Sequence, residues 1–143
     1  MKVSEIISAL ASLCILISSC AKEPSGIHKD IESVRIQGTV TDENGTPIEH
    51  IKVIFNWNSG SYYDIKYTSS IGKFETHLKD DPDSDVINLV ISLQDIDGQS
   101  NGGLFESHSE TVTLIKEDII TESVLRFDYR LNRATASESN PRS

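Results

Sequence analysis

Residues Ile36–Phe55 read IQGTVTDENGTPIEHIKVIF, and this stretch decides the fold class. Apolar and polar residues alternate over Val34–Val40 and again over Ile51–Trp57. A period of two places one side of each segment in a core, which is typical of half-buried strands. Asn44-Gly45, between the two segments, is the dipeptide that most favours a tight hairpin turn. The stretch therefore predicts two strands joined by a short turn.

The same signals continue toward the C-terminus. Turn-forming or charged segments, such as Lys79–Asp85 and Asp95–Gly103, separate short apolar runs. We expect five further strands at Tyr63–Thr68, Phe74–Leu78, Val86–Leu93, Phe105–Leu114 and Val124–Leu131, and a weak helical turn within Lys116–Glu122. Seven short strands predict an all-β fold, a seven-stranded antiparallel sandwich over residues 33–132. A polar tail over residues 133–143 is expected to be disordered. Phe55 and Leu89 are expected in the shared core.

Composition limits the class of protein. The 143 residues suit one domain, and 13 Lys and Arg against 22 Asp and Glu give a formal net charge of −9. An acidic chain lacks the basic face that nucleic-acid binding requires, so no nucleic-acid partner is expected. The two cysteines, Cys14 and Cys20, lie near the N-terminus, which excludes a disulfide framework in the body of the chain.

The first twenty residues predict an export signal. Ile6–Ile17 is mostly apolar, and as a helix it would reach about 18 Å, well short of the roughly 30 Å hydrocarbon core of a membrane. That length is typical of a signal-peptide helix, although a buried helix of the domain is the alternative. Ile17-Ser18-Ser19-Cys20, which follows, resembles a bacterial lipobox.

The lipobox resemblance implies that residues 1–19 are a lipoprotein signal peptide and that Cys20 is the lipidation site. Cys20 would then carry a diacylglycerol thioether and an N-acyl chain, and two or three acyl chains anchor a protein stably to a membrane. Residues 20–32 are polar and are expected to form a tether. Ala21 after the cysteine favours the outer membrane, with the leaflet left open, so the membrane itself is the first expected partner.

The hairpin stretch is similar to the opening of the carboxypeptidase regulatory-like family, which has a prealbumin-like (transthyretin-like) sandwich. Its pattern is a strand ending in Gly-x-Val, a turn and a Pro-led second strand. The matching residues here are Gly38, Val40, Asp42, Gly45, Pro47, Ile48, Ile51 and Val53, while His50 stands where Gly is frequent. The resemblance implies a prealbumin-like fold and says little about function, because such domains occur in many secreted proteins.

A second stretch, Leu93–Ser107 (LQDIDGQSNGGLFES), is similar to a segment of small lipoproteins that are encoded beside radical-SAM enzymes. Those proteins share the lipobox, the hairpin and this loop in the same order. The resemblance implies that the chain is a partner or a substrate of such an enzyme.

Catalytic signatures are weak. The histidines, at positions 28, 50, 77 and 108, are too scattered to predict a zinc site, and no serine lies in a Gly-x-Ser-x-Gly turn. The cysteine of the mature chain would be acylated, so no nucleophile has a visible base. We therefore expect a protein that is not an enzyme, and a hydrolase is disfavoured.

Two sets of residues could bind a ligand. Asp95, Asp97, Asn101 and Glu106 supply oxygen atoms for calcium, or they form a turn in which Asp95 and Asp97 accept backbone N–H groups. The aromatic residues Trp57, Tyr62, Tyr63 and Tyr67 could form a platform for sugar rings, or they fill strands.

The sequence predicts a lipid-anchored cell-envelope lipoprotein that acts as a non-enzymatic interaction module, with an envelope protein or a radical-SAM enzyme as its partner. The expected covalent group is the lipid at Cys20, and no other cofactor is expected. The alternative is a glycan- or calcium-binding module on the outer membrane.

Overall fold

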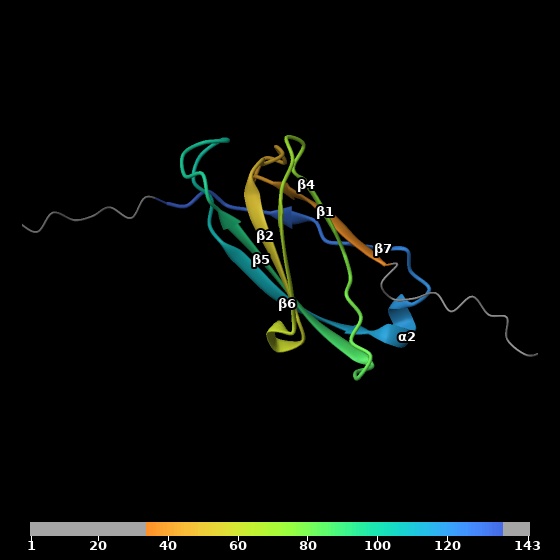
Figure 1. Ribbon diagram of the computed structural model, residues 1–143. Coiled ribbons are helices and arrows are strands. Elements are labelled where there is room, and N and C mark those ends of the chain that lie inside the picture. Colours follow the sequence, from red (N-terminus) through yellow and green to blue (C-terminus); the bar gives the residue numbers. More distant parts are fainter. Residues whose placement is uncertain (1–33, 136–143) are drawn as a thin grey trace, which may run out of the picture.

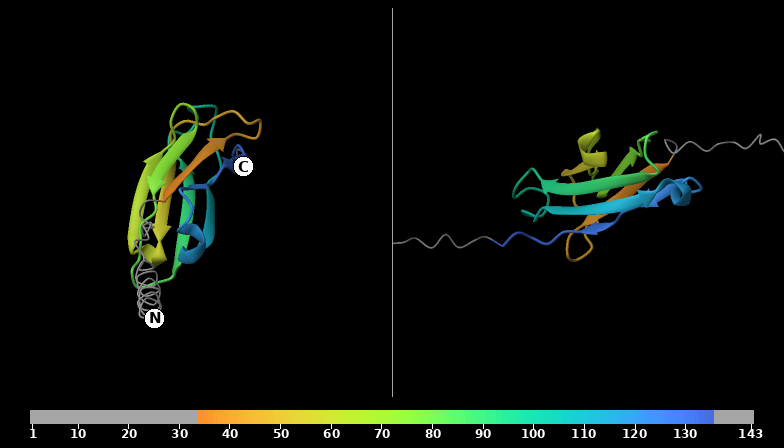
Figure 2. Two further views of the ribbon diagram at one scale, coloured as in Figure 1. Left: turned by 90° about the vertical axis from the view of Figure 1, so that its right-hand side faces the viewer. Right: turned by 90° about the horizontal axis from the view of Figure 1, so that it is seen from below.

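The computed structural model describes residues 34–135, which form two four-stranded sheets packed face to face (Figure 1, Figure 2). The first sheet, here called the β2/β5 sheet, has the order β3-β2-β5-β6. Its strands are β2 (Ile51–Trp57), β3 (Tyr62–Tyr67), β5 (Val86–Asp95) and β6 (His108–Ile115). All of its pairings are antiparallel.

The second sheet, here called the β1/β4 sheet, is centred on β1 (Arg35–Thr41). Strand β4 (Lys73–His77) pairs with one side of β1 in antiparallel direction. Two short strands, β7 (Val124–Arg126) and β8 (Tyr129–Arg130), pair with its other side in parallel direction. A 3-10 turn, η2 (Asn58–Gly60), follows β2, and a short helix, α2 (Lys116–Ile119), follows β6.

The core lies between the sheets and follows the period-two pattern of the sequence. Phe55 and Leu89 are fully buried, as predicted. The ring of Phe55 lies 6.0 Å from that of Trp57 in the same sheet and 5.9 Å from that of Phe74 in the opposite sheet. These rings and the buried aliphatic side chains of β1, β2 and β5 form one continuous cluster. Burial of apolar surface is the main stabilising contribution in such a domain.

The predicted seven-stranded antiparallel arrangement is corrected in two respects: the sheets contain eight strands, and β1 has parallel neighbours. The segment predicted as one strand over residues 124–131 is broken between β7 and β8. A Cβ atom at Gly38 would lie 1.8 Å from the carbonyl oxygen of Phe127, so the chain passes very close to β1 there. Asp128 Oδ1 then accepts hydrogen bonds from Thr39 N (2.9 Å) and Thr39 Oγ1 (2.7 Å). A side chain thus replaces one step of the backbone ladder and separates the two strands.

Two boundaries also differ from the prediction. Strand β6 begins at His108 rather than Phe105, and Phe105 is buried in the preceding loop, where it forms a bridge with Arg133. Arg133, expected in the tail, packs onto the domain: its guanidinium pairs with Asp42 (3.3 Å) and Glu43 (2.7 Å). The C-terminal segment therefore ties the turn after β1 to the rest of the molecule.

The predicted signal peptide, Cys20, the tether up to residue 33 and the tail from residue 136 lie outside the described residues. Within residues 34–135, no helix is long and apolar enough to cross a membrane.

Candidate functional site

The Asp95–Gly103 loop has the geometry of a turn around a carboxylate. Asp95 Oδ1 accepts a hydrogen bond from the backbone N–H of Asp97 (3.1 Å), and Oδ2 accepts one from that of Phe105 (2.9 Å). Both oxygen atoms of Asp95 are thus occupied by the chain itself, as the turn interpretation expects.

The other predicted calcium ligands are arranged differently. The side-chain amide of Asn101 donates to Asp97 Oδ2, and His50 Nδ1 lies 3.8 Å from that oxygen, so Asp97 contacts side chains instead of the predicted backbone amides. Glu106 contributes its backbone N–H to Asn132 O (2.9 Å). No group of three or more His, Cys, Asp or Glu side chains in residues 34–135 is placed to hold a metal ion.

The predicted aromatic platform is split between the core and the surface. Trp57 is 1% exposed and belongs to the core, so its inclusion in the platform is wrong. Tyr62 is half-buried and packs against the core. Tyr63 and Tyr67 are 58% and 53% exposed, and they lie on the outer side of β3 with half-buried Ile65 between them.

Tyr63 and Tyr67 belong to a surface with almost no charge, the outer side of the β2/β5 sheet. The register of its strands places these side chains there: Lys52, Ile54, Asn56, Tyr63, Ile65, Tyr67, Val86, Asn88, Val90, Ser92, Gln94, Ser109, Thr111, Thr113 and Ile115. Lys52 is the one charged residue of this set, and the set contains no carboxylate, although 24% of the chain is charged. We call this surface the low-charge face.

Hydrogen bonds between neighbouring strands order the polar side chains of the low-charge face. The hydroxyl groups of Ser92 and Ser109 lie 2.8 Å apart, and Thr113 Oγ1 donates to Asn88 Oδ1 at 3.2 Å. Ile54, Ile65 and Val90 are half-buried between the polar residues. The result is an ordered surface of hydroxyl, amide, tyrosine and aliphatic groups.

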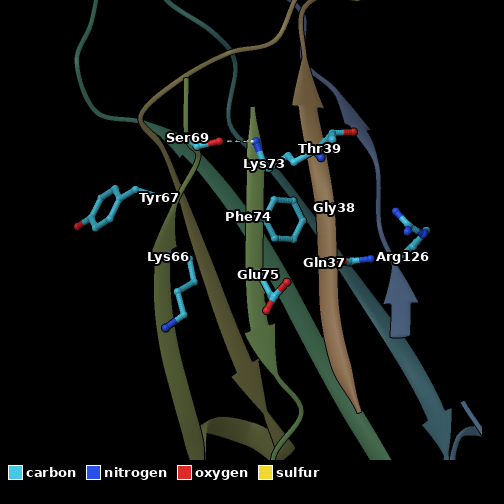
Figure 3. A pocket seen from close by; sticks show the side chains of 10 residues that line it. All are labelled: Gln37, Gly38, Thr39, Lys66, Tyr67, Ser69, Lys73, Phe74, Glu75 and Arg126. Carbon is cyan, nitrogen blue, oxygen red and sulfur yellow. Dashed lines mark hydrogen bonds between the residues drawn. The ribbon is translucent and has the colours of Figure 1, made fainter. Parts of the chain in front are cut away.

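The outer side of the β1/β4 sheet, here called the charged face, differs from the low-charge face because it carries many charged side chains. Its outward residues include the cations Arg35, Lys73, Arg126 and Arg130 and the carboxylates of Glu75 and Asp128. A hollow of about 360 Å³ runs across it toward β3 (Figure 3). The hollow is lined by Gln37, Gly38, Thr39, Lys66, Tyr67, Ser69, Lys73, Phe74, Glu75 and Arg126.

The edge strands β3 and β4 are joined beside this hollow by one polar pair. Thr76 Oγ1 donates a hydrogen bond to Asp64 Oδ2, and Lys66 Nζ lies 3.2 Å from the same oxygen. Partial burial alone would raise the pKa of Asp64. The hydrogen bond from Thr76 and the ammonium group of Lys66 together outweigh this effect, so the pKa lies below its ordinary value. Asp64 is therefore ionised at neutral pH.

The opposite edge of the sandwich is closed by a buried phenol. Tyr129 OH donates to Glu110 Oε1 at 2.5 Å, and the Tyr129 ring lies 6.3 Å from that of Phe74. Burial, together with the bond to Glu110 and its charge, raises the pKa of Tyr129 far above its ordinary value. Tyr129 stays protonated and serves as a hydrogen-bond donor.

Sequence reasoning missed Lys66, Lys73 and Arg126 as neighbours across one hollow. Alternation in each strand already indicates that Lys73 and Arg126 point outward. Their proximity depends on β4 and β7 flanking β1, a pairing for which the sequence carries no local signal.

No protein-family model matches this sequence, and no curated protein matches it. Similar solved structures include a Bacillus anthracis TIE protein (TM-score 0.44, 11% identity, covering 70% of this chain and 16% of that chain). They also include 5-hydroxyisourate hydrolase of Klebsiella pneumoniae, a transthyretin-like protein (TM-score 0.46, 11% identity, covering 71% of this chain and 92% of that chain). A third is the dioxygenase domain of a dioxygenase and carbohydrate-binding protein fusion from Streptomyces sp. SirexAA-E (TM-score 0.43, 13% identity, covering 71% of this chain and 80% of that chain). At these TM-scores, the likenesses carry no argument about activity.

Proposed function

We propose that this protein is a lipid-anchored, non-enzymatic module of the bacterial cell envelope that binds a partner protein through the low-charge face. The observation that carries the proposal is the absence of carboxylates from that face in a chain with 22 Asp and Glu residues. The centres of protein interfaces are depleted of charge and enriched in tyrosine. Binding of a partner to this surface dehydrates few charged groups, so the desolvation cost of binding is small.

The anchor is part of the proposal and rests on the lipobox-like Ile17-Ser18-Ser19-Cys20. The described domain begins at Val34, and Arg35 N donates to Ser123 O (3.1 Å) beside α2, so the chain enters at that end of the sandwich (Figure 1). The point at which the described domain begins is therefore at one end of the sandwich.

The partner is an envelope protein, and a radical-SAM enzyme is the specific candidate implied by the resemblance of Leu93–Ser107 to its associated lipoproteins. Asp64 and Tyr129, at the two edges of the sandwich, are each engaged in a hydrogen bond between strands. Asp64 is held ionised and Tyr129 is held protonated at neutral pH, which suits hydrogen-bonded ties better than proton transfer.

The anchor is tested by Cys20→Ser in the native host. The wild-type protein is expected to incorporate radioactive palmitate and to stay with washed membranes, whereas Cys20→Ser does neither. Intact mass of the mature wild-type protein gives the attached lipid directly. Palmitate labelling that survives in Cys20→Ser would disprove the lipid anchor.

The binding face is tested by photocrosslinking in cells. A benzophenone amino acid at exposed Thr111 of the low-charge face is expected to give a discrete adduct, and the same group at exposed Arg130 of the charged face serves as the matched control. Mass spectrometry of the adduct identifies the partner. Adducts from position 130 alone, or from neither position, would refute the assignment.

A further inference from the structure

The hollow on the charged face carries a feature that the proposed function does not use. Lys73 and Arg126 both line it, and within residues 34–135 neither has a carboxylate within ion-pair distance. Lys52, Lys79 and Arg130 also have no carboxylate within ion-pair distance in residues 34–135, so Lys73 and Arg126 are distinguished by lining the same hollow.

The carboxylates nearest to the hollow are already occupied. Glu75, which lines it, lies 3.8 Å from Arg35, and Asp64 is bonded to Lys66 and Thr76. Asp128, on the same face, accepts two hydrogen bonds from Thr39. The hollow therefore presents a net positive charge on an acidic protein. A negatively charged ligand would gain charge-assisted hydrogen bonds from Lys73 and Arg126.

The other walls indicate the body of the ligand. Figure 3 shows the Phe74 ring between β4 and β1, with Tyr67 on one side and Arg126 on the other. The Tyr67 side chain is directed away from the other lining side chains in Figure 3, because it lies on the outer side of β3 and belongs to the low-charge face. Gln37, Thr39 and Ser69 provide amide and hydroxyl groups that match sugar hydroxyls.

We propose that this hollow binds an acidic oligosaccharide, with its carboxylates at Lys73 and Arg126 and its hydroxyl groups at Gln37, Thr39 and Ser69. An acidic peptide is the competing ligand, and peptides commonly bind by adding a strand to a sheet edge. The free edge of β4 is obstructed for that purpose, because β3 lies beside it and Asp64 is bonded to Thr76 there. This inference is independent of the low-charge face and of the partner proposed for it.

The test is a titration of the full chain in detergent micelles, followed by amide resonances in NMR spectra. Trigalacturonate is expected to shift the amides of Gln37, Thr39 and Ser69, while neutral maltotriose and hexaglutamate do not shift them. The affinity for trigalacturonate is expected to fall as salt is added, because exposed charges are screened.

Substitutions locate the site. Lys73→Gln and Arg126→Gln are each expected to weaken trigalacturonate binding about tenfold, as for the loss of one charge-assisted hydrogen bond. Arg130→Gln removes the same charge from the same face outside the hollow and is expected to leave the affinity unchanged.

Four results would overturn the proposal: no shift with trigalacturonate, equal shifts with maltotriose, equal affinity for hexaglutamate, or an affinity that survives both substitutions in the hollow. Each outcome concerns the charged face alone, so it leaves the crosslinking test of the low-charge face unaffected.

Discussion

The two outer faces of the sandwich are built by the same strand geometry and differ in chemistry. The charged face presents Arg35, Lys73, Arg126 and Arg130 with Glu75 and Asp128, as expected for a sheet side exposed to water. The low-charge face presents hydroxyl, amide, tyrosine and aliphatic groups with one lysine. This difference in charge is the observation behind the proposal that a partner protein covers the low-charge face.

The largest predicted effect concerns the sheet that carries the charged face. Gly38→Ala would place a Cβ atom 1.8 Å from Phe127 O and 2.6 Å from Phe74 Cζ, so β7 and β8 cannot keep their places against β1. We expect the variant to lose more than about 3 kcal/mol, beyond the usual cost of overpacking, or to fail to fold. Circular dichroism during urea unfolding measures this loss.

Gly98→Ala is the matched control, because a Cβ atom there meets no atom within 4 Å. Its φ of +65° still makes alanine unfavourable, at a cost of about 1 kcal/mol. Equal losses in the two variants would show that the close approach of Phe127 to β1 has no structural role.

The second prediction compares the inner and outer sides of the β2/β5 sheet. Phe55→Ala is expected to cost roughly 3–5 kcal/mol, because it removes a ring from the centre of the core. Tyr63→Ala, on the low-charge face, is expected to change stability by less than about 0.5 kcal/mol. Urea midpoints of the two variants measure the contrast, and a large loss for Tyr63→Ala would mean that its ring is a structural element.

The third prediction concerns the Asp95 loop, at the end of the sandwich. Asp95→Ala is expected to cost about 1–3 kcal/mol, because the amides of Asp97 and Phe105 lose their acceptor. Calcium at millimolar concentration is expected to leave the melting temperature of the wild type unchanged. A rise in melting temperature with calcium that Asp95→Ala abolishes would show instead that the loop is a metal site.

The smallest predicted effect concerns Asp64 at the edge beside the charged face. Its pKa in the folded protein lies below the unfolded value of about 3.9, so its ionised form stabilises the fold above about pH 4. That contribution is lost as the pH falls through the folded pKa. Asp64→Asn is therefore expected to melt below the wild type at neutral pH, with a difference that shrinks in acid. Melting temperatures measured from neutral to acidic pH test this, and a constant difference would contradict it.

Alternation in the sequence predicts most of the fold, because each strand has one buried side. The alternation also indicates that Trp57 is buried, because it continues the buried series of Ile51, Val53 and Phe55. The prediction of an exposed Trp57 relied only on its aromatic ring. The break between β7 and β8 was not predictable, because it depends on Gly38 lying opposite Phe127 in another strand.

The candidate surfaces are less predictable than the strands. The outward residues of each strand can be identified in the sequence, but their assembly into a face requires the strand order. Lys73 and Arg126 lie 53 positions apart in the chain and flank one hollow because β4 and β7 both pair with β1. That neither cation has an ion-pair partner within residues 34–135 becomes evident only from the positions of the neighbouring carboxylates.

The most direct test of the central claim inserts one negative charge into each face and measures the crosslink formed from position 111. Asn56→Asp, in the row between Tyr63 and Val90, keeps the shape of the low-charge face and adds a carboxylate at its centre. Gln37→Glu makes the matched change on the charged face. We predict that Asn56→Asp strongly reduces the adduct and that Gln37→Glu leaves its yield unchanged. An adduct of equal yield in both variants would contradict the claim that the low-charge face binds the partner.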